Sequence, residues 1–388
     1  MSGENEPTER PAFVDDTQLW EKPLPECFRG LKFFEPDRLL PRETAYFVRA
    51  HANGHINIQS RGVDEVAKWI LSRYRNNEMC CMDFPNHELH PKTADRAAID
   101  WIFLVSTLNF SLWTNEEYKI QVTYKDKVYS GYYALAACVN RALEAGMPLT
   151  DAKFMKNLTV QNVCDIFKGT YKKKGAIICF FSFYVYVLVN TCRLCVGTSL
   201  FSFQKFDGSF YNCLAACERS AVKLLALIVE NFPSYRDYAT YDNQRISFLK
   251  KAQVLIGHLY SCCKGKNDLG DFKDFDQITM CADYHIPQVL AYFMVLQYSP
   301  GLRESLKTRH IFEVDDEIVI ELRAISVLAV EEIAEKIKEL RDASDSEMQE
   351  ICPYDVGAFL WHYRRENAEK VDKHITFLRP YMTGAEEV

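Results

Sequence analysis

Residues 246–260 read ISFLKKAQVLIGHLY and carry a helical pattern that sets the class of the fold. Apolar residues recur there at three- and four-residue spacing, so that they line one face of a helix. These residues are Phe248, Leu249, Ala252, Leu255, Ile256 and Leu259. The pattern predicts a helix over residues 247–262. Lys250 and Lys251 fall within it and are either solvated charges at the side of the helix, which is the usual case, or include one cation directed at an anionic ligand.

Helical periodicity recurs on both sides of this segment and changes clearly at one place. It predicts helices at residues 41–52, 63–75, 95–113, 133–146, 160–168, 210–231, 287–297, 318–341 and 354–365. Residues 118–124 (YKIQVTY) and 127–133 (KVYSGYY) alternate around a Lys-Asp turn, which is typical of a β-hairpin. The sequence therefore predicts a mainly α fold, a single helical domain over residues 29–388 with a small β-hairpin. Residues 1–28 are charged, polar and proline-containing, and we expect a disordered leader there.

Composition and net charge limit which kinds of molecule this protein is expected to bind. Apolar residues make up 48% of the 388-residue chain, which is ample for a globular core. The formal net charge is −7, with acids and bases mixed along the chain. Because nucleic-acid backbones are bound by clustered lysine and arginine, this balance argues against direct binding of nucleic acid. A small anionic ligand held by one or two cations remains compatible with it.

The 14 cysteines are interpreted as reduced thiols. Residues 1–30 contain no apolar core of a secretory signal, so we expect a cytoplasmic location, or a nuclear one. Cys192 and Cys195 form a CxxC pair, and Cys213 and Cys217 lie four residues apart, so the two pairs together have the elements of a zinc site. The CxxC pattern is short and common, however, and we interpret these residues as buried thiols rather than as metal ligands.

An uncharged run of 18 residues stands out at 175–192 (GAIICFFSFYVYVLVNTC). Its length just reaches that of a membrane span. It is rich in Phe, Tyr and Val rather than in Leu and Ala, and Ser182 and Asn190 interrupt it. We therefore interpret it as an atypical apolar insert at about 168–205, with a membrane anchor as the alternative.

The common catalytic motifs are missing, since there is no phosphate-binding glycine loop, no HExxH and no GxSxG. His87 and His90 in NHELHP lie three residues apart, but Pro91 follows at once, so we interpret this segment as a loop. The feature most suggestive of chemistry is instead an isolated acid, Asp283, in the apolar stretch 279–290 (TMCADYHIPQVL).

Two interpretations of Asp283 are open. It caps the helix that contains Pro287, although four residues is slightly far for that role. Alternatively it is a carboxylate in a dry pocket, acting as a nucleophile or as an electrostatic partner for developing positive charge. Lys250 favours the second, because a buried aspartate with a nearby lysine suits a phosphate-bearing substrate and a cationic transition state. His285 is either structural or a general acid or base.

Several stretches occur in an order that resembles one family. They are DWIFLVSTLNFSLW (100–113), YSGYYALAACVNRALEAGMPLT (129–150), FDGSFYNC (206–213), ENFPSYRD (230–237), RISFLKKAQVL (245–255) and DQITMCADYHIPQVLAYF (276–293). The chain resembles the queuosine salvage protein family of queuosine 5′-phosphate N-glycosylases, from about residue 40 to the tail LWHYRREN…HITFLRPYM, with a break near 168–205. The resemblance implies a helical fold related to the helix-hairpin-helix DNA glycosylases. It also implies hydrolysis of the bond between ribose and queuine, with no metal or organic cofactor.

The resemblance also assigns roles to individual residues. Asp283 matches the aspartate of the family motif ADYR(V/L)PQ and would lie under the ribose C1′, where positive charge grows as the base leaves. Lys250 matches the lysine of F(Y)KRAQ and would bind the 5′-phosphate or support Asp283. The expected substrate-binding residues are Asn109, Phe110, Trp113, Tyr132, Tyr133, Tyr235, Arg236, Asp237, Tyr284 and His285. The candidates for stacking on the base are Phe110, Trp113, Tyr132, Tyr133 and Tyr284. Asn109 and Asp237 would read its edge, and Arg236 would meet the phosphate or pair with an acid. Arg379 and Tyr381 would close the pocket, and packing in the core is the alternative for each aromatic ring.

The sequence departs from the family pattern in places. Ser106 stands where an acid is expected, Tyr133 where a tryptophan is, and His285 where an arginine is. A non-catalytic protein of the same fold that holds queuine or a nucleotide is therefore the alternative function. The apolar run near 168–205 stands where the family has a polar helical stretch. Our hypothesis is that this run is retained intron sequence or the result of a gene-model error. Sequencing the transcript across codons 165–210 tests this, and an abundant spliced message encoding the run would refute it.

Overall fold

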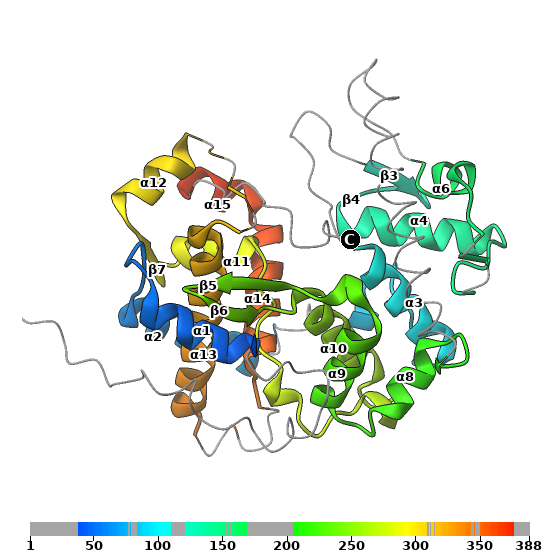
Figure 1. Ribbon diagram of the computed structural model, residues 1–388, viewed down its shortest axis with the longest axis horizontal. Coiled ribbons are helices and arrows are strands. Elements are labelled where there is room, and N and C mark those ends of the chain that lie inside the picture. Colours follow the sequence, from blue (N-terminus) through cyan, green and yellow to red (C-terminus); the bar gives the residue numbers. More distant parts are fainter. Residues whose placement is uncertain are drawn as a thin grey trace, which may run out of the picture.

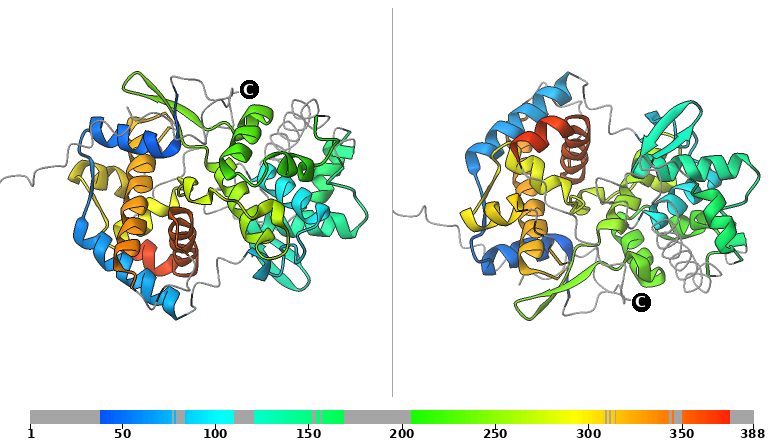
Figure 2. Two further views of the ribbon diagram at one scale, coloured as in Figure 1. Left: turned by 90° about the horizontal axis from the view of Figure 1, so that it is seen from below. Right: turned by 90° about the horizontal axis from the view of Figure 1, so that it is seen from above.

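Two hydrophobic cores, each surrounded by helices, organise the computed structural model of this chain (Figure 1). The structure describes residues 38–76, 78, 84–109, 121–151, 154–155, 157–168, 205–308, 310, 312–313, 315–342, 345 and 350–375. Views from below and from above show that the two lobes lie side by side (Figure 2). We name them the α13 lobe and the α10 lobe, after the helix at the centre of each.

The α13 lobe is built around one long helix, α13 (Glu317–Leu340), which is buried around most of its circumference. Helices α1 (Pro41–His51), α2 (Ser60–Arg75), α11 (His285–Tyr292) and α14 (Pro353–Glu366) pack against it. The lobe is completed by α12 (Pro300–Lys307), α15 (Ala368–His374) and the antiparallel pair of β2 (Ile56–Ile58) with β7 (Leu296–Tyr298). Because a helix that is apolar nearly all round needs neighbours on every side, α13 fixes how this lobe assembles.

The α10 lobe has α10 (Lys250–Cys263) at its centre, with α3 (Arg96–Leu108) and α9 (Ala221–Asn231) packed against it. The other elements of this lobe are the 3₁₀ turn η4 (Phe84–Asn86), α4 (Tyr132–Glu144), α6 (Val160–Ile166) and α8 (Phe210–Ala216). The apolar face predicted from residues 246–260 is the face that α10 buries, since Leu255, Ile256 and Leu259 are all fully buried. The pattern thus identified the central helix of this lobe.

The predicted β-hairpin is confirmed, and a second hairpin accompanies it. Strand β3 (Gln121–Tyr124) pairs antiparallel with β4 (Lys127–Ser130), and the Lys-Asp turn has φ values of 48° and 62°, as a two-residue hairpin turn of type I′ requires. The second hairpin joins β5 (Tyr238–Tyr241) to β6 (Gln244–Ser247) through an Asp-Asn turn of the same hand, with β1 (Arg38–Leu39) parallel to β6. The prediction of one hairpin was therefore incomplete.

Most of the described residues lie in helices, so the mainly α prediction is confirmed, with some changed boundaries. Residues 210–231 form two helices instead of one, because Glu218 and Arg219 adopt left-handed backbone conformations with φ values of 55° and 66°. The central helix of the α10 lobe begins only at Lys250, because Leu249 is also left-handed, with φ at 49°.

Two predictions fall outside the described part of the chain, namely the leader at residues 1–28 and the apolar run at 175–192. Among the residues that the structure does describe, no helix is both long enough and apolar enough to cross a membrane. The assignment of residues 29–388 to a single domain stays a prediction.

Helix α14 connects the two cores. Val356, Phe359 and Leu360 belong to the core of the α13 lobe, whereas Tyr354, the second residue of α14, packs against the core of the α10 lobe. Gly257 of α10 makes this approach possible, because a Cβ atom at that position would lie only 1.8 Å from a ring atom of Tyr354. The contact sets how closely the lobes approach each other.

We predict that Gly257→Ala lowers the free energy of unfolding by about 1–3 kcal/mol, because the Tyr354 ring has to shift and the contact is overpacked. The measurement is urea denaturation of the purified protein. Gly301→Ala in α12 is the matched control, since no atom lies within 4 Å of its added Cβ and alanine favours a helix over glycine by about 1 kcal/mol. Equal effects of the two substitutions would contradict the proposed contact.

Candidate active site

A carboxylate and two basic side chains meet where the two lobes face each other. Lys250 Nζ lies 2.8 Å from Asp283 Oδ2, and His285 Nδ1 lies 2.6 Å from Asp283 Oδ1. Lys250 comes from the first residue of α10, whereas Asp283 and His285 come from the start of α11. The three side chains are only 13–18% exposed, so little of the cluster reaches bulk water. Each carboxylate oxygen therefore has its own partner, and the orientation of the group is fixed.

The start of α11 positions Asp283. Its Oδ1 accepts the backbone N–H of His285 at 2.8 Å, and its carbonyl accepts the backbone N–H of Ile286 at 3.2 Å. The helix begins at His285, two residues before the predicted start, so Asp283 is close enough to bond an N–H of the first turn. The geometry is compatible with both interpretations of Asp283. Its side chain accepts a hydrogen bond from the first turn of α11, and it is also a mostly buried carboxylate beside a lysine.

Neighbouring charge keeps Asp283 ionised. Burial raises the pKa of this carboxyl group, but Lys250 and His285 together outweigh burial and hold the pKa of Asp283 well below its usual range. An ionised carboxylate only accepts hydrogen bonds, so Nδ1 of His285 carries the proton that lies between them. Such a group suits a nucleophile or a stabiliser of positive charge, and it does not suit a proton donor near neutral pH.

A second carboxylate holds the start of α10. Asp237 Oδ2 accepts the backbone N–H of Lys250 at 3.1 Å, and Arg323 of α13 donates to both oxygens of Asp237 at 3.0 and 2.5 Å. Burial raises the pKa of Asp237, but Arg323 outweighs it, so the pKa of this carboxyl group is also lowered. The backbone of Lys250 is thereby tied to the centre of the α13 lobe.

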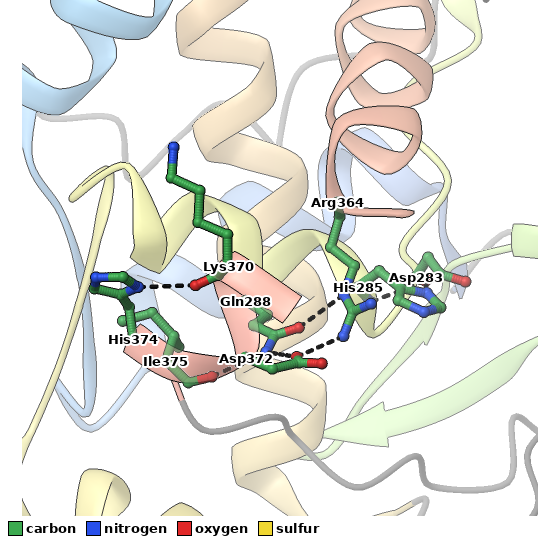
Figure 3. Close-up of polar contacts among 8 residues, drawn as sticks. All are labelled: Asp283, His285, Gln288, Arg364, Lys370, Asp372, His374 and Ile375. Carbon is green, nitrogen blue, oxygen red and sulfur yellow. Dashed lines mark hydrogen bonds and ion pairs between the residues drawn. The ribbon is translucent and has the colours of Figure 1, made fainter. Parts of the chain in front are cut away.

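Behind Asp283, an arginine of α14 fixes α11 against α15 (Figure 3). Arg364 donates to Gln288 Oε1 at 2.9 Å and to Asp372 Oδ1 at 2.7 Å. Gln288 in turn donates to Asp372 Oδ1 and to the carbonyl of Ile375, both at 2.9 Å. The segment that presents Asp283 and His285 is therefore supported by two other helices.

Aromatic rings of the α13 lobe lie beside the charged cluster, and further rings face them from the α10 lobe. The Tyr284 ring lies 4.2 Å from the His285 ring, and Trp361 of α14 meets His285 edge-on at 6.3 Å. In the α10 lobe, Tyr133 stacks on His87 at 4.0 Å with the rings nearly parallel. A guanidinium connects the two sides, because Arg365 lies 5.0 Å from the ring of Tyr133 and 5.0 Å from that of Trp361.

A family model described as queuosine salvage protein matches residues 89–381 of the chain. The chain belongs to the queuosine salvage protein family. Similar proteins carry the name queuosine 5′-phosphate N-glycosylase/hydrolase. That of Bos taurus is 38% identical over 334 residues, which is 85% of this chain and 94% of that protein. That of Mus musculus is 37% identical over 345 residues, covering 88% and 97%. That of Schizosaccharomyces pombe is 30% identical over 335 residues, covering 84% and 91%.

The resemblance recognised in the sequence is thus confirmed, and the matched region of this queuosine salvage family member contains the whole charged cluster. Four of the site residues predicted from the sequence come together in the fold, namely Lys250, Asp283, Tyr284 and His285. Tyr133 approaches them from the other lobe through Arg365. Asp237 is present too, but it binds Arg323 and the backbone of Lys250.

Other predicted residues have contacts of their own in the folded chain. Tyr132 is buried in the α10 lobe, with its hydroxyl 3.1 Å from a histidine nitrogen. Tyr235 is also buried there, and its hydroxyl bonds a threonine of α3. Arg236 is exposed and donates to two carbonyls at the end of α9, and Asn109 directly follows α3. Their contact with a substrate stays a prediction, and packing and helix capping are the roles that these contacts support. Phe110, Trp113, Arg379 and Tyr381 lie outside the described residues.

Sequence reasoning missed three side chains of the site, Arg323, Trp361 and Arg365. Arg323 left a signal, because it is a charged residue inside the strongly apolar run of α13 and is only 3% exposed. A charge buried in such a helix is expected to have a partner of opposite charge elsewhere in the fold. Trp361 and Arg365 lie in the tail segment that carried the family resemblance, but nothing in their spacing indicated which face of α14 they occupy.

No metal site accompanies the cluster in the described parts of the chain, where no group of three or more His, Cys, Asp or Glu side chains could hold an ion. Cys213 and Cys217 are fully buried, and burial raises the pKa of Cys217 to about 11 and that of Cys213 further, so both thiols stay protonated. Cys192 and Cys195 lie outside the described residues. His87 and His90 follow the η4 turn in a loop, as predicted.

We predict that Lys250→Met raises the pKa of Asp283, because it removes the cation nearest to the carboxylate. Ionised Asp283 stabilises the wild-type fold above the unfolded-state pKa of about 3.9, and this stability is lost as the pH falls through the lower folded-state pKa. Because the unfolded-state pKa is the same in the variant, the loss begins at the same pH, but it is smaller and is complete at a higher pH. The measurement is the free energy of unfolding from pH 7 downward, with NMR of the Asp283 carboxyl carbon.

Lys251→Met is the matched control. This neighbouring lysine donates to the carbonyls of Thr107 and Ser234 and lies near the Tyr235 ring, so its removal is expected to leave the pKa of Asp283 unchanged. An equal rise in both variants would show that general loss of positive charge, rather than the Lys250 contact, sets the ionisation of Asp283.

Proposed function

We propose that this protein hydrolyses the N-glycosidic bond of queuosine 5′-phosphate and releases the base queuine for salvage into tRNA modification. The names of its relatives support the substrate and the reaction. The observation that carries the proposal is Asp283, a carboxylate that is nearly buried and yet bonded on one oxygen by Lys250 and on the other by His285. A carboxylate at the sugar stabilises the positive charge that develops on the ribose when an N-glycosidic bond breaks.

The chemistry follows from where charge develops. As the bond between ribose C1′ and the base nitrogen breaks, the bonding pair leaves with the base, and positive charge grows on the ribose ring. Asp283 stabilises that charge or captures C1′ covalently, and water then supplies the hydroxyl that remains on C1′ while the base takes up a proton. Because the site is shielded from bulk water, the attraction between carboxylate and ribose is stronger than it would be in water.

The rings around the cluster suit a flat heterocycle. Bases extracted from a stack are commonly held between aromatic side chains. Tyr284 and Trp361 from the α13 lobe lie beside His285, and Tyr133 from the α10 lobe is connected to Trp361 through Arg365, so these three rings are the candidates. In this arrangement the base lies between the lobes, with its glycosidic bond directed at Asp283.

The phosphate needs a cation, and those expected from the sequence are engaged elsewhere. Lys250 pairs with Asp283, and Arg236 donates to carbonyls of α9. Arg365 differs from both, since within the described ranges it forms no ion pair, and its guanidinium lies beside the aromatic rings of Tyr133 and Trp361. A half-buried guanidinium between the lobes is well suited to a phosphate monoester, and we assign the 5′-phosphate to Arg365.

Asp283→Asn is predicted to lower the rate of queuine release by about a thousandfold or more, because the neutral amide cannot stabilise the ribose cation. The measurement is chromatographic detection of queuine from queuosine 5′-phosphate, with binding of the nucleotide followed by calorimetry. Release by the variant at the wild-type rate would remove Asp283 from the mechanism. Binding without release by the folded wild type would instead favour the alternative of a non-catalytic nucleotide-binding protein.

Arg365→Met is predicted to lower kcat/KM for queuosine 5′-phosphate by about 10–100-fold, the effect of losing a charged hydrogen bond of about 1.5–3 kcal/mol. The rate with unphosphorylated queuosine, however low, is expected to stay the same. Arg236→Met serves as the control and is expected to affect neither substrate. An equal loss with nucleotide and nucleoside would contradict a phosphate-binding role for Arg365.

Three finer expectations from the sequence remain predictions. They are a fold related to the helix-hairpin-helix DNA glycosylases, a cytoplasmic or nuclear location, and the absence of nucleic acid as a direct partner. A mainly helical chain with a buried aspartate just before a helix is compatible with the first. The formal charge of −7 supports the third, because it leaves little excess of cations for a phosphate backbone.

A further inference from the structure

The backbone just before Lys250 has an unfavourable conformation. Leu249 has φ at 49° and ψ at 35°, in the left-handed region that side chains with a Cβ atom rarely adopt. Leu249 occupies the N-cap position of α10, and its side chain makes no hydrogen bond to the first turn of the helix. Because such a conformation persists only where the surrounding structure enforces it, other groups have to hold this turn in place.

Asp237 supplies the bonds on both sides of the turn. Its carbonyl accepts the backbone N–H of Phe248 at 2.9 Å, and its Oδ2 accepts the backbone N–H of Lys250 at 3.1 Å. These two bonds enclose Leu249. The carboxylate thereby satisfies one of the unpaired N–H groups at the start of α10 and adds a negative charge where the helix dipole favours it.

Arg323 in turn fixes Asp237. The arginine is almost fully buried in the middle of α13 and grips the carboxylate with two nitrogens. Its guanidinium also lies over the ring of Phe248, at 3.9 Å from the centroid. One side chain from the centre of the α13 lobe therefore holds both ends of the turn that leads into α10.

We propose that Asp237, held by Arg323, is a positioning residue that places Lys250 against Asp283 across the two lobes. Most of α10 packs in one lobe, and Asp283 heads a helix of the other, so the contact of 2.8 Å requires the first residue of α10 to be fixed relative to the α13 lobe. Asp237 and Arg323 provide that connection. Contact of Asp237 with the edge of the base, which the sequence suggested, stays a separate prediction.

The charged and titratable groups around Asp283 determine how its pKa would change if the contact between Asp237 and Arg323 were lost. They are Lys250 from α10, His285 and Cys281 from the same segment as Asp283, and Arg364 from α14. A shift of Lys250 removes the nearest cation while the other groups stay in place. The direct consequence is a higher pKa of Asp283, and the kinetic consequence, which rests on the proposed function, is a slower chemical step.

The test compares three variants. Asp237→Asn keeps the shape of the side chain and removes its charge, and Arg323→Lys keeps the charge and removes the two-pronged grip. Asp345→Asn is the matched control, because Asp345 is a buried carboxylate held by two nitrogens of Arg75, at 2.9 and 2.7 Å, in another part of the α13 lobe. The readouts are the pKa of Asp283 by NMR of its carboxyl carbon, and kcat and KM for queuosine 5′-phosphate.

In Asp237→Asn we expect a higher pKa of Asp283 and a kcat lowered by about 10–100-fold, with KM changed by less than about threefold. Arg323→Lys is expected to give smaller changes in the same direction. Asp345→Asn is expected to destabilise the fold while leaving the pKa of Asp283 and kcat as in the wild type. Changes in Asp283 that are equally large in Asp345→Asn would indicate a merely structural effect and would overturn the proposal.

A folded Asp237→Asn with wild-type values of both readouts would likewise overturn it. If Asp237→Asn does not fold, the pKa of Asp283 and kcat in Arg323→Lys test the proposal instead, and wild-type values of both would overturn it. The NMR titration does not depend on turnover. If the wild type releases no queuine, the proposed function therefore fails, while the positioning role is still supported or refuted by the pKa of Asp283.

Discussion

The ion pair between Lys250 and Asp283 is the contact on which the rest of this structure depends. Its two partners are the first residue of one helix and the residue two before the start of another, in different lobes. Their separation of 2.8 Å is therefore a property of the whole assembly and not of either helix alone. Three features contribute to this separation. They are the contact of Tyr354 in α14 with Gly257 in α10, the left-handed turn at Leu249, and Arg323 of α13, which binds Asp237. The site is best described as a junction between two cores.

This junction resolves a conflict in the proposed chemistry. A shielded site strengthens the attraction between a carboxylate and a cationic ribose, but the same shielding favours the neutral, protonated acid. Lys250 and His285 keep the acid charged without exposing it to water. The same two partners also make the carboxylate a weaker nucleophile. Electrostatic stabilisation of the ribose cation is accordingly better matched to this geometry than rapid covalent capture.

Local patterns predicted the helices well, because an apolar face depends only on nearby residues. The second hairpin was missed because its strands are four residues each and its turn is Asp-Asn without glycine. The break between α8 and α9 was missed for a similar reason, since Glu218 and Arg219 adopt left-handed backbones that their residue types do not announce. In both cases the chain turns at left-handed residues other than glycine, which the hydrophobic pattern does not report.

The candidate site was predictable only in part. Lys250 and Asp283 were both identified, yet their direct contact joins residues far apart in the sequence, and no periodicity reports such a pairing. The contact of Asp237 with Arg323 was not predicted, because an acid looks the same in the sequence whether it meets a ligand or a buried arginine. Only the charge inside the apolar run of α13 indicated that Arg323 needed a partner.

The most direct test of this account is the pH dependence of queuine release in a single turnover of the wild type, with circular dichroism confirming the fold at each pH. If Asp283 is held ionised between the lobes, the rate shows no fall through the ordinary aspartate range near a pH of about 4. A rate that collapses with an apparent pKa near that value, as for an unpaired aspartate, would contradict the account.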